Sequence, residues 1–525
     1  MISKVYNKVE TGGYMNNRMS YMSIVILILL ASSLVYGQYW YYNERPQEPL
    51  FPNISNRMRA LGEDFSGIIS DLETDVLQNP SLASLLESKS IGITFLPYYY
   101  YTSYFPPTLL TLLLPNFPVS KLAIGFQNQF VYTKSGYFET YANLYDEFWS
   151  HQYSFMSYQQ LFFLAFTPSE HFSIAPFYIL TKSPYQEQSS DDWGRNENNT
   201  YASSYNSTSQ YDDNILYHQF GIGTTFNSQT NSFQITAAFK TGDNKIKLDD
   251  ETYHTMFDIY SYTYEYDSSY YFDQYWRYHN ETDTKSIDKT KKVNELNISF
   301  RWQKEINDDN TFNTLVRFTR SSAALTGSEL GNSYYAAIDS SLHRWRNYPY
   351  PESTEINIST YINGNKDSSD IKGTAKSLNL TLGFGYESRL NRRLNGFIGV
   401  KSILGIATDT SSKLGIRITT VDTITDTTGI SGSQLVESKS FSIALPLGLE
   451  FRLLPSLTIR TGFTPKFSYD KSGLATHRQI VNFKGVLLYS FGIGYIFRDK
   501  FSIDTYNYGN LGSLSNWNIQ LKYMF

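Results

Sequence analysis

The side chains of this 525-residue chain that could do chemistry are scattered rather than grouped. The chain has no cysteine, which excludes disulfide frameworks, thiolate metal sites and thiol nucleophiles. Its seven histidines stand at positions 151, 171, 218, 254, 279, 343 and 477, and no two of them have the spacing of metal ligands. We find no phosphate-binding loop, nucleophile elbow or dinucleotide fingerprint. These observations predict a protein that is not an enzyme and holds no cofactor and no metal.

The overall composition excludes further classes of protein. The net charge of -5 argues against a nucleic-acid partner, which would select for a basic surface. The mean hydropathy of -0.36 is too low for a bundle of membrane-spanning helices. The chain contains 45 Tyr, 35 Phe and 7 Trp, so it is not a disordered chain either. Several soluble domains or one large β-barrel remain possible.

The elements that must position these side chains are amphipathic strands. In the segment 517–525, Trp517, Ile519, Leu521, Tyr523 and Phe525 alternate with more polar residues, which predicts a strand with one apolar face. The same alternation recurs in 293–304, 375–389, 438–453 and 483–497. A soluble sandwich would turn the apolar face to its core, whereas an outer-membrane barrel would turn it to lipid.

Three features favour the barrel. The predicted strands run for about 9 to 15 residues, whereas soluble strands average about 5–6. Aromatic residues gather at strand ends, where the two interfaces of a membrane would lie. Short turns, for example Asn227 to Asn231, also alternate with long polar stretches, which are predicted as loops at 183–213, 242–292, 322–373, 408–436 and 471–482. We therefore predict an all-β fold, a transmembrane antiparallel β-barrel of 14 strands, or of up to 16 if 90–101 and 108–114 form a further hairpin.

Several charged residues fall on the polar face of these strands. The alternation predicts that Arg301, Arg317, Glu387, Glu450, Arg452 and Arg460 point into the lumen. They could line a solvated pore, or pair across neighbouring strands and stiffen the wall. Pro446 interrupts an otherwise regular strand and predicts a kink or a plain bulge there, because proline cannot donate to the ladder.

A Tyr-rich stretch from Tyr253 to Tyr278 contains nine tyrosines. Tyrosine combines a rigid apolar body with a polar tip and suits binding at wet surfaces. The stretch could bind an apolar or sugar ligand, contact another protein, or pack on itself as an extracellular lid.

The N-terminus carries an export signal. The apolar run Ile24–Val35 follows Arg18, and Val35 and Gly37 are small enough for cleavage before Gln38. Residues 1–37 are predicted to be a signal peptide, within which Met15, Met19 and Met22 offer alternative start codons. Residues 38–89 then form a periplasmic N-terminal segment, and 90–525 form the barrel with long extracellular loops.

Residues 56–77 have apolar residues close to helical spacing, and Pro80 stops any helix at about Gln78. Around them stand Arg59-Ala60-Leu61-Gly62, Phe65-Ser66-Gly67, Asp75 and Asn79-Pro80-Ser81. This stretch resembles the N-terminal segment of the FadL/TodX/OmpP1 family of outer-membrane transport proteins, with PorV-like proteins as relatives. Glu63 and Ser81 depart from the family's pattern.

The resemblance implies a hatch inside the barrel, with Leu61, Gly62, Phe65, Gly67, Asp75, Asn79 and Pro80 as its candidate residues. A short amphipathic helix at the base of the barrel is the alternative. The resemblance also implies that a kink such as that at Pro446 could open the wall sideways. The last strand, with Leu521, Tyr523 and Phe525 on one face, resembles the targeting strand read by the outer-membrane assembly machinery.

The resemblance implies passive uptake of hydrophobic small molecules, such as long-chain fatty acids or hydrocarbons, across the bacterial outer membrane. The expected partners are the lipid bilayer, the hydrophobic ligand and the assembly machinery. The alternative is a barrel that transports nothing and serves as a partner, shuttle or structural protein, as PorV-like proteins do.

Overall fold

The computed structural model describes residues 55–86, 88–95, 108–116, 121–143, 145–197, 201–266, 269–347, 353–474, 480–508 and 517–525. The predicted signal peptide lies outside the described residues, as do positions 38–54 of the N-terminal segment.

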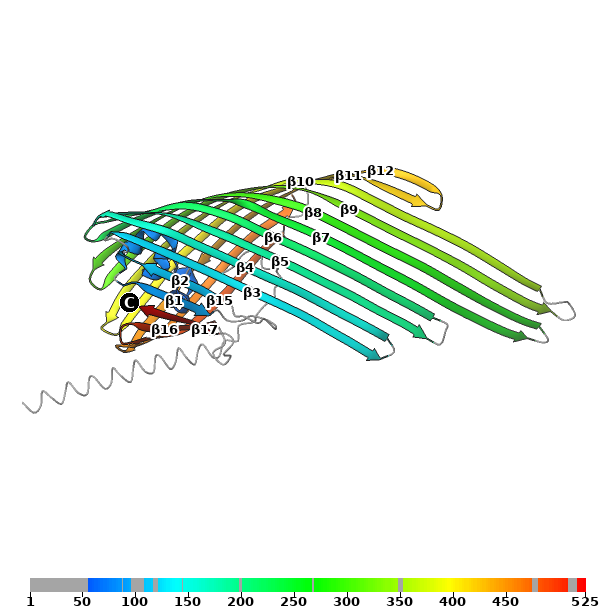
Figure 1. The fold of residues 1–525 in the computed structure, drawn as a ribbon, viewed down its shortest axis with the longest axis horizontal. Helices are drawn as coiled ribbons and strands as arrows, with labels where there is room; N and C mark the ends of the chain where they lie inside the picture. The colour runs from blue at the N-terminus through cyan, green and yellow to red at the C-terminus, as the bar shows by residue number, and fades with distance from the viewer. Residues whose placement is uncertain are drawn as a thin grey trace, which may run out of the picture.

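The described chain is one antiparallel sheet that closes into a ring (Figure 1). The ring has 16 strands, because β12 and β13 are the two halves of one interrupted strand, and β1 pairs with both β2 and β17. The predicted transmembrane-type barrel is thereby confirmed at the upper of the two strand counts. Its strands are β1 (Ser90–Phe95), β2 (Thr108–Leu114), β3 (Leu122–Asn143), β4 (Tyr145–Ser169), β5 (Phe172–Glu197), β6 (Tyr201–Asn227), β7 (Asn231–Tyr266), β8 (Ser269–Asn307), β9 (Asn310–Asn347), β10 (Ser353–Asn391), β11 (Leu394–Val421), β12 (Ile424–Ala444), β13 (Leu447–Leu454), β14 (Leu457–Leu474), β15 (Ile480–Phe497), β16 (Phe501–Tyr508) and β17 (Trp517–Met524).

An apolar belt surrounds the outside of the ring near its short turns. On β6 and β7 it includes Phe220, Ile222 and Phe226 beside Phe233, Ile235 and Phe239, all of them more than a third exposed. On β10 it runs from Leu378 to Tyr386, and this length matches the roughly 9–11 residues with which a tilted strand crosses a bilayer. So many large apolar side chains exposed on the outer surface indicate that this surface faces lipid.

Beyond the belt, β3 to β12 continue as one curved sheet, which we call the extension (Figure 1). The expectation of long loops is wrong here: the stretches 183–213, 242–292, 322–373 and 408–436 are mostly paired strand. β7 alone runs 27 residues past Phe239, or about 90 Å at about 3.3 Å per residue. In contrast, the short turns lie close to where the sequence predicts them, for example between Asn227 and Asn231.

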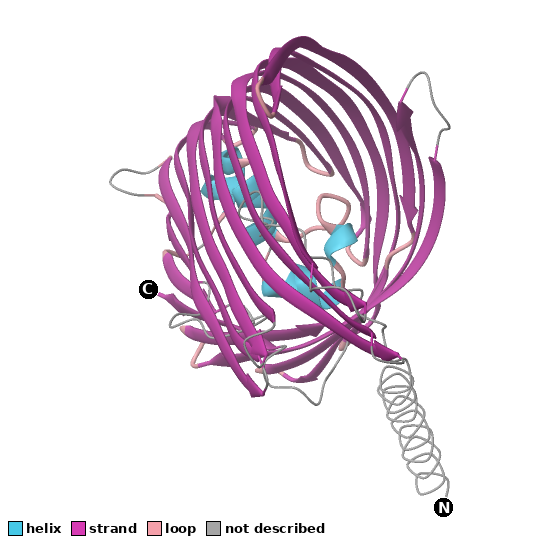
Figure 2. Ribbon diagram, turned by 90° about the vertical axis from the view of Figure 1, so that its right-hand side faces the viewer, coloured by secondary structure: helices cyan, strands magenta, loops and turns pink. Residues whose placement is uncertain are grey.

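The N-terminal segment lies inside the ring (Figure 2). It consists of α2 (Asn56–Leu61), η1 (Glu63–Phe65), α3 (Leu72–Gln78) and η2 (Pro80–Leu85), and we call Ser55–Leu86 the inner segment. The predicted stop before Pro80 is confirmed, whereas the helix predicted over 56–77 is broken between Gly62 and Asp71. Within the described part of the chain, no helix is long and apolar enough to cross a membrane.

Candidate functional site

The inner segment is shaped by caps at each of its turns. The Ser55 hydroxyl accepts from the Met58 N–H at 3.1 Å and donates to Asp71 at 2.5 Å, so the start of α2 is tied to the start of α3. Asp71 in turn caps α3 by accepting from the Thr74 N–H. Gly62 ends α2 with a φ of 120°, a conformation that residues with a side chain rarely adopt.

A charged cluster fixes α2 to the wall. Arg57 donates to Glu450 at 2.9 Å, Arg460 donates to the same carboxylate at 2.8 Å, and Arg460 also reaches Asp504 at 2.5 Å. Burial alone would lower the pKa of Arg57, but Glu450 and Asp71 outweigh this and raise it above its ordinary value. Arg57 is therefore charged at every physiological pH, and its ion pair with Glu450 holds α2 to β13. Arg460 extends this network to β14 and β16 within the wall.

A second cluster fixes α3 to β8, β9 and β10. Arg301 and Asp75 lie 2.6 Å apart, and both are about 7% exposed. The contact is an ion pair rather than an aligned hydrogen bond, since Asp75 Oδ1 has no hydrogen-bond donor in the described structure. Arg301 also donates to the Ile69 carbonyl at 2.8 Å. Burial raises the pKa of Asp75 even though Arg301 opposes the shift.

Glu387 and Asn79 provide further polar anchors. The Glu387 carboxylate accepts from the Ser70 N–H, and from Asn313 at 3.0 Å. Asn79 caps η2 through Ser81 and donates to the Thr224 carbonyl of β6 at 3.2 Å. These polar contacts supplement the two ion-pair clusters around the inner segment.

Apolar contacts fill the space between these anchors. Phe65 packs edge-on against Phe397 of β11 at 6.2 Å between ring centroids, and Leu61 lies in the same buried cluster. Gly462 lets the wall approach closely, because a Cβ there would lie 2.0 Å from the Leu61 carbonyl oxygen. Gly67 is buried beside Leu315.

All seven candidate hatch residues are therefore buried within the ring, where they contact its wall or one another. Of the six predicted lumen charges, Arg301, Glu387, Glu450 and Arg460 meet the inner segment or its ion pairs. Arg452 is exposed near the short turns, where it makes no contact with the inner segment in the described structure. Arg317 shares its face with Asn313 and Leu315, and no hydrogen bond or ion pair joins it to another described residue. Alternation predicted the face of these residues but not their partners.

The wall is interrupted at Leu445 and Pro446, between β12 and β13. The Pro446 carbonyl accepts from the Gly399 N–H at 2.9 Å, but proline has no N–H to return the bond to β11. On the neighbouring strand, the Pro465 carbonyl accepts from the Leu445 N–H at 2.9 Å. Pro465 also has no N–H, so it donates no hydrogen bond back to Leu445. Two ladder bonds are therefore missing at one place. The sequence analysis did not single out Pro465, although a proline inside a predicted strand is the same signal as Pro446.

An apolar hollow of about 700 Å³ lies on the outer face just below this break. Its lining includes Tyr386, Ile398, Leu447 and Phe463, which share the outward face of their strands. Phe397, Gly448 and Gly462 also line it, and these residues contact Phe65 and Leu61 of the inner segment. The hollow and the inner segment are thus separated by the thickness of the wall.

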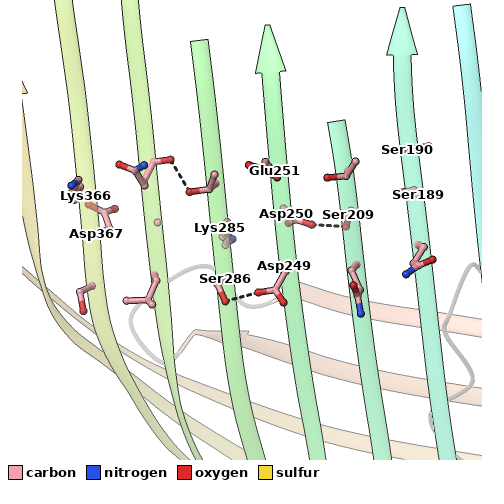
Figure 3. Close-up of a pocket in the computed structure, with 18 of the residues that line it drawn as sticks. Ser189, Ser190, Ser209, Asp249, Asp250, Glu251, Lys285, Ser286, Lys366 and Asp367 are labelled. Atoms are coloured by element: carbon pink, nitrogen blue, oxygen red, sulfur yellow. Dashed lines mark hydrogen bonds between the residues drawn. The ribbon is translucent and has the colours of Figure 1, made fainter. Parts of the chain in front are cut away.

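A second hollow, of about 1030 Å³, lies on the extension (Figure 3). Asp249 accepts from Ser286 at 2.6 Å, and Asp250 accepts from Ser209, so neighbouring strands are joined by hydroxyl–carboxylate pairs. Nearby, Arg417 holds Asp367 in a two-point ion pair at 2.7 and 2.8 Å. Within the described ranges, no group of three or more His, Asp or Glu side chains is placed to hold a metal ion.

Comparison with known proteins gives matches among solved structures alone. No family model matches the chain, and no curated protein does so. The fold is similar to that of FadL-like and TodX-like channels. A FadL homologue of Pseudomonas aeruginosa aligns with 89% of this chain and 96% of its own at 10% identity and a TM-score of 0.32. The Pseudomonas putida toluene transporter TodX aligns with 90% and 97% at 10% identity and a TM-score of 0.29. The monoaromatic hydrocarbon channel CymD aligns with 90% and 98% at 9% identity and a TM-score of 0.30. These are distant likenesses, so the function is inferred below from the residues of this chain.

Proposed function

We propose that this chain is an outer-membrane channel for the passive uptake of hydrophobic small molecules, with the inner segment as its hatch. The apolar belt around a closed antiparallel ring supports placement in an outer membrane, because closure leaves no free strand edge in lipid.

The observation that carries the proposal is the apolar hollow next to the break at Pro446. A water-filled pore needs no opening in its wall, whereas an apolar molecule gains free energy by leaving sideways into the bilayer. Here the wall lacks two ladder bonds, and Phe397 connects the outer hollow to Phe65 on the hatch. A ligand released by the hatch would enter lipid there without crossing the polar end of the barrel, and no energy source is required.

Restoring the ladder is expected to slow uptake. In the double variant Pro446→Ala/Pro465→Ala each residue can donate again, and each restored hydrogen bond contributes about 1 kcal/mol net. The closed wall would be favoured by roughly thirtyfold. The measurement is uptake of labelled toluene and labelled oleate by a bacterial host that lacks its own hydrophobic channels.

The matched control is Pro176→Ala, a proline on β5 away from the break, which should transport like the unmodified protein. Uptake by the double variant at the unmodified rate would contradict the lateral exit. If the unmodified protein raises uptake of neither compound, the transport proposal itself is wrong.

Arg317 favours an acid over a plain hydrocarbon as the ligand. It is the next residue after Leu315 on the inner face of β9, on the side away from the short turns. Arg317 is half-buried and has no hydrogen-bond or ion-pair partner among the described residues. Such a guanidinium suits a carboxylate head group, while the alkyl chain follows the apolar route.

We expect Arg317→Gln to weaken oleate binding by roughly tenfold or more, since a hydrogen bond to a charged group contributes about 1.5–3 kcal/mol. Binding of methyl oleate, which has no charge, should not change. Titration of the purified protein with both ligands measures the difference. Arg320→Gln, on the outward face of the same strand, is the control, and equal losses for acid and ester would refute the assignment.

A further inference from the structure

A row of five aromatic rings crosses five neighbouring strands of the extension. Tyr205 of β6 and His254 of β7 lie 6.2 Å apart, and His254 and His279 of β8 lie 6.1 Å apart, measured between ring centroids. His279 and Tyr335 of β9 are 6.1 Å apart, and Tyr335 and Tyr361 of β10 are again 6.1 Å apart. We call these five residues the aromatic row.

The row lies on the face that continues the lumen. Along β7 the pairing register is continuous from Asn231 to Tyr266, so residues of even number share one face. The buried residues Gln234 and Ala238 point inward near the base, and His254 therefore points to the same side. It lies 15 residues past Phe239, or about 50 Å along the strand. A molecule that approaches the lumen from the far end would pass the row before it reaches the hatch.

Polar atoms without partners lie among the rings. His279 Nδ1 and Asn363 Oδ1 are buried, and neither has a hydrogen-bond partner within the described structure. Asn363 is the direct cross-strand neighbour of Tyr335. A buried polar atom left unpaired costs about 1–3 kcal/mol, so a ligand that reaches both atoms would gain their hydrogen bonds. The two atoms differ in their needs, because an amide oxygen only accepts whereas a ring nitrogen donates or accepts according to its tautomer.

A polar hollow of about 480 Å³ borders the row on the side of the barrel. Thr252, Ser333 and Asn365 line it, and each is two residues from a member of the row or from Asn363 along its own strand. Charged side chains also line the hollow: Asp250, Asp283, Lys285, Glu329, Asp367 and Arg417. Hydroxyl and amide groups of this kind exchange hydrogen bonds with a ligand that carries many hydroxyls.

His279 is the member of the row whose pKa is shifted from its ordinary value. Burial lowers the pKa of His279, and His254 and Arg277 lower it further. On the other side of the row, Arg277 is neutralised by Asp339 at 3.0 Å. Glu281, the cross-strand neighbour of both His254 and Tyr335, places a carboxylate beside the row. The arrangement therefore offers aromatic rings, hydrogen-bonding groups and a carboxylate that can accept from a ligand hydroxyl.

We propose that the aromatic row binds a neutral oligosaccharide chain, laid across the strands. Sugars combine apolar C–H faces, which pack on aromatic rings, with hydroxyls that both donate and accept. The nearly uniform spacing of the rings suits a chain of repeating units, whereas a single small hydrocarbon would need one pocket. This site is separate from the hatch and from the break at Pro446.

The test is titration of the full-length purified protein in detergent with maltohexaose, cellohexaose and chitohexaose, followed by tyrosine fluorescence and calorimetry. At least one of the three should bind. Tyr335→Ala should weaken that binding by roughly tenfold. Tyr335→Phe, which keeps the ring, should retain it within a factor of about two. Tyr275→Ala is the control, because Tyr275 is an exposed tyrosine of β8 outside the row, packed against His343.

Heat-dependent gel mobility shows that each variant remains a folded barrel. Two outcomes would overturn the proposal: no binding of any of the three sugars by the unmodified protein, or equal binding by the Tyr335→Ala variant. Preferential binding of toluene to the row, lost in Tyr335→Ala, would overturn it as well.

Discussion

Arg301→Met is expected to release the hatch while the barrel stays closed. The substitution leaves the Asp75 carboxylate buried without its cation, and breaking a buried pair in this way costs about 3–5 kcal/mol. It also removes the donor to the Ile69 carbonyl. Since α3 is only seven residues long, a loss of this size exceeds what its remaining local contacts can hold. Backbone hydrogen exchange over 70–79 should accelerate by about two orders of magnitude or more.

Two controls separate this effect from general damage. Adding Asp75→Asn removes the orphaned charge, so the double variant Arg301→Met/Asp75→Asn should recover much of the protection, and the double-mutant cycle measures the coupling. Arg277 lies on β8, as Arg301 does, and forms an exposed ion pair with Asp339 of β9. Breaking that pair by Arg277→Met should lower the free energy of unfolding by no more than about 1 kcal/mol. If the backbone amides of 70–79 exchange as slowly in Arg301→Met as in the unmodified chain, the ion pair does not hold the inner segment in place.

The second large effect is expected at Glu450→Gln. One carboxylate oxygen of Glu450 accepts from both Arg57 and Arg460. Neutralising it leaves these two half-buried guanidinium groups close together, with Asp71 and Asp504 as their remaining partners. The expected loss is again about 3–5 kcal/mol. Since Arg57 belongs to α2 and Arg460 to the wall, the repulsion acts between hatch and barrel. Hydrogen exchange at the Arg59 and Gly62 amides reports the loosening of α2.

Removing one of the two cations should reverse the effect. In Glu450→Gln/Arg57→Met the Arg460–Asp504 pair remains neutral, and α2 should be more protected than in Glu450→Gln alone. Glu329→Gln is the matched control, because Glu329 also lies between two cations, Lys285 and Lys413, but on the extension and closer to water. Strictly additive losses in the double variant would argue against repulsion as the cause.

The sequence predicted the part of the wall within the apolar belt well, because lipid on one face and the lumen on the other impose opposite demands on alternate residues. Leu378 to Tyr386 could be assigned to the outward face without a structure for that reason. The extension has water on both faces, so alternation disappears, and its strands are held mainly by the backbone ladder. The stretch 242–292 therefore looked like a loop. Its Thr, Tyr and Ile content was the only local signal for a strand.

The hatch contacts lay beyond sequence reasoning for a different reason. Alternation placed Arg301 and Glu450 in the lumen, but their partners Asp75 and Arg57 are hundreds of residues away. No local periodicity encodes such a pairing. The aromatic row is similar, because its five members come from five strands and meet only through the register of the sheet.

The closing pair of the ring has a consequence for the order of folding. β1 joins β17 through pairs such as Ser90 with Met524, so the ring cannot close before the last residues of the chain are present. The inner segment is synthesised before any strand, yet Arg57 can form its ion pair only after Glu450, 393 residues later, has been synthesised. Contacts of such long range close late and slowly. The inner segment is therefore among the first parts of the barrel to be made and among the last to find its final contacts.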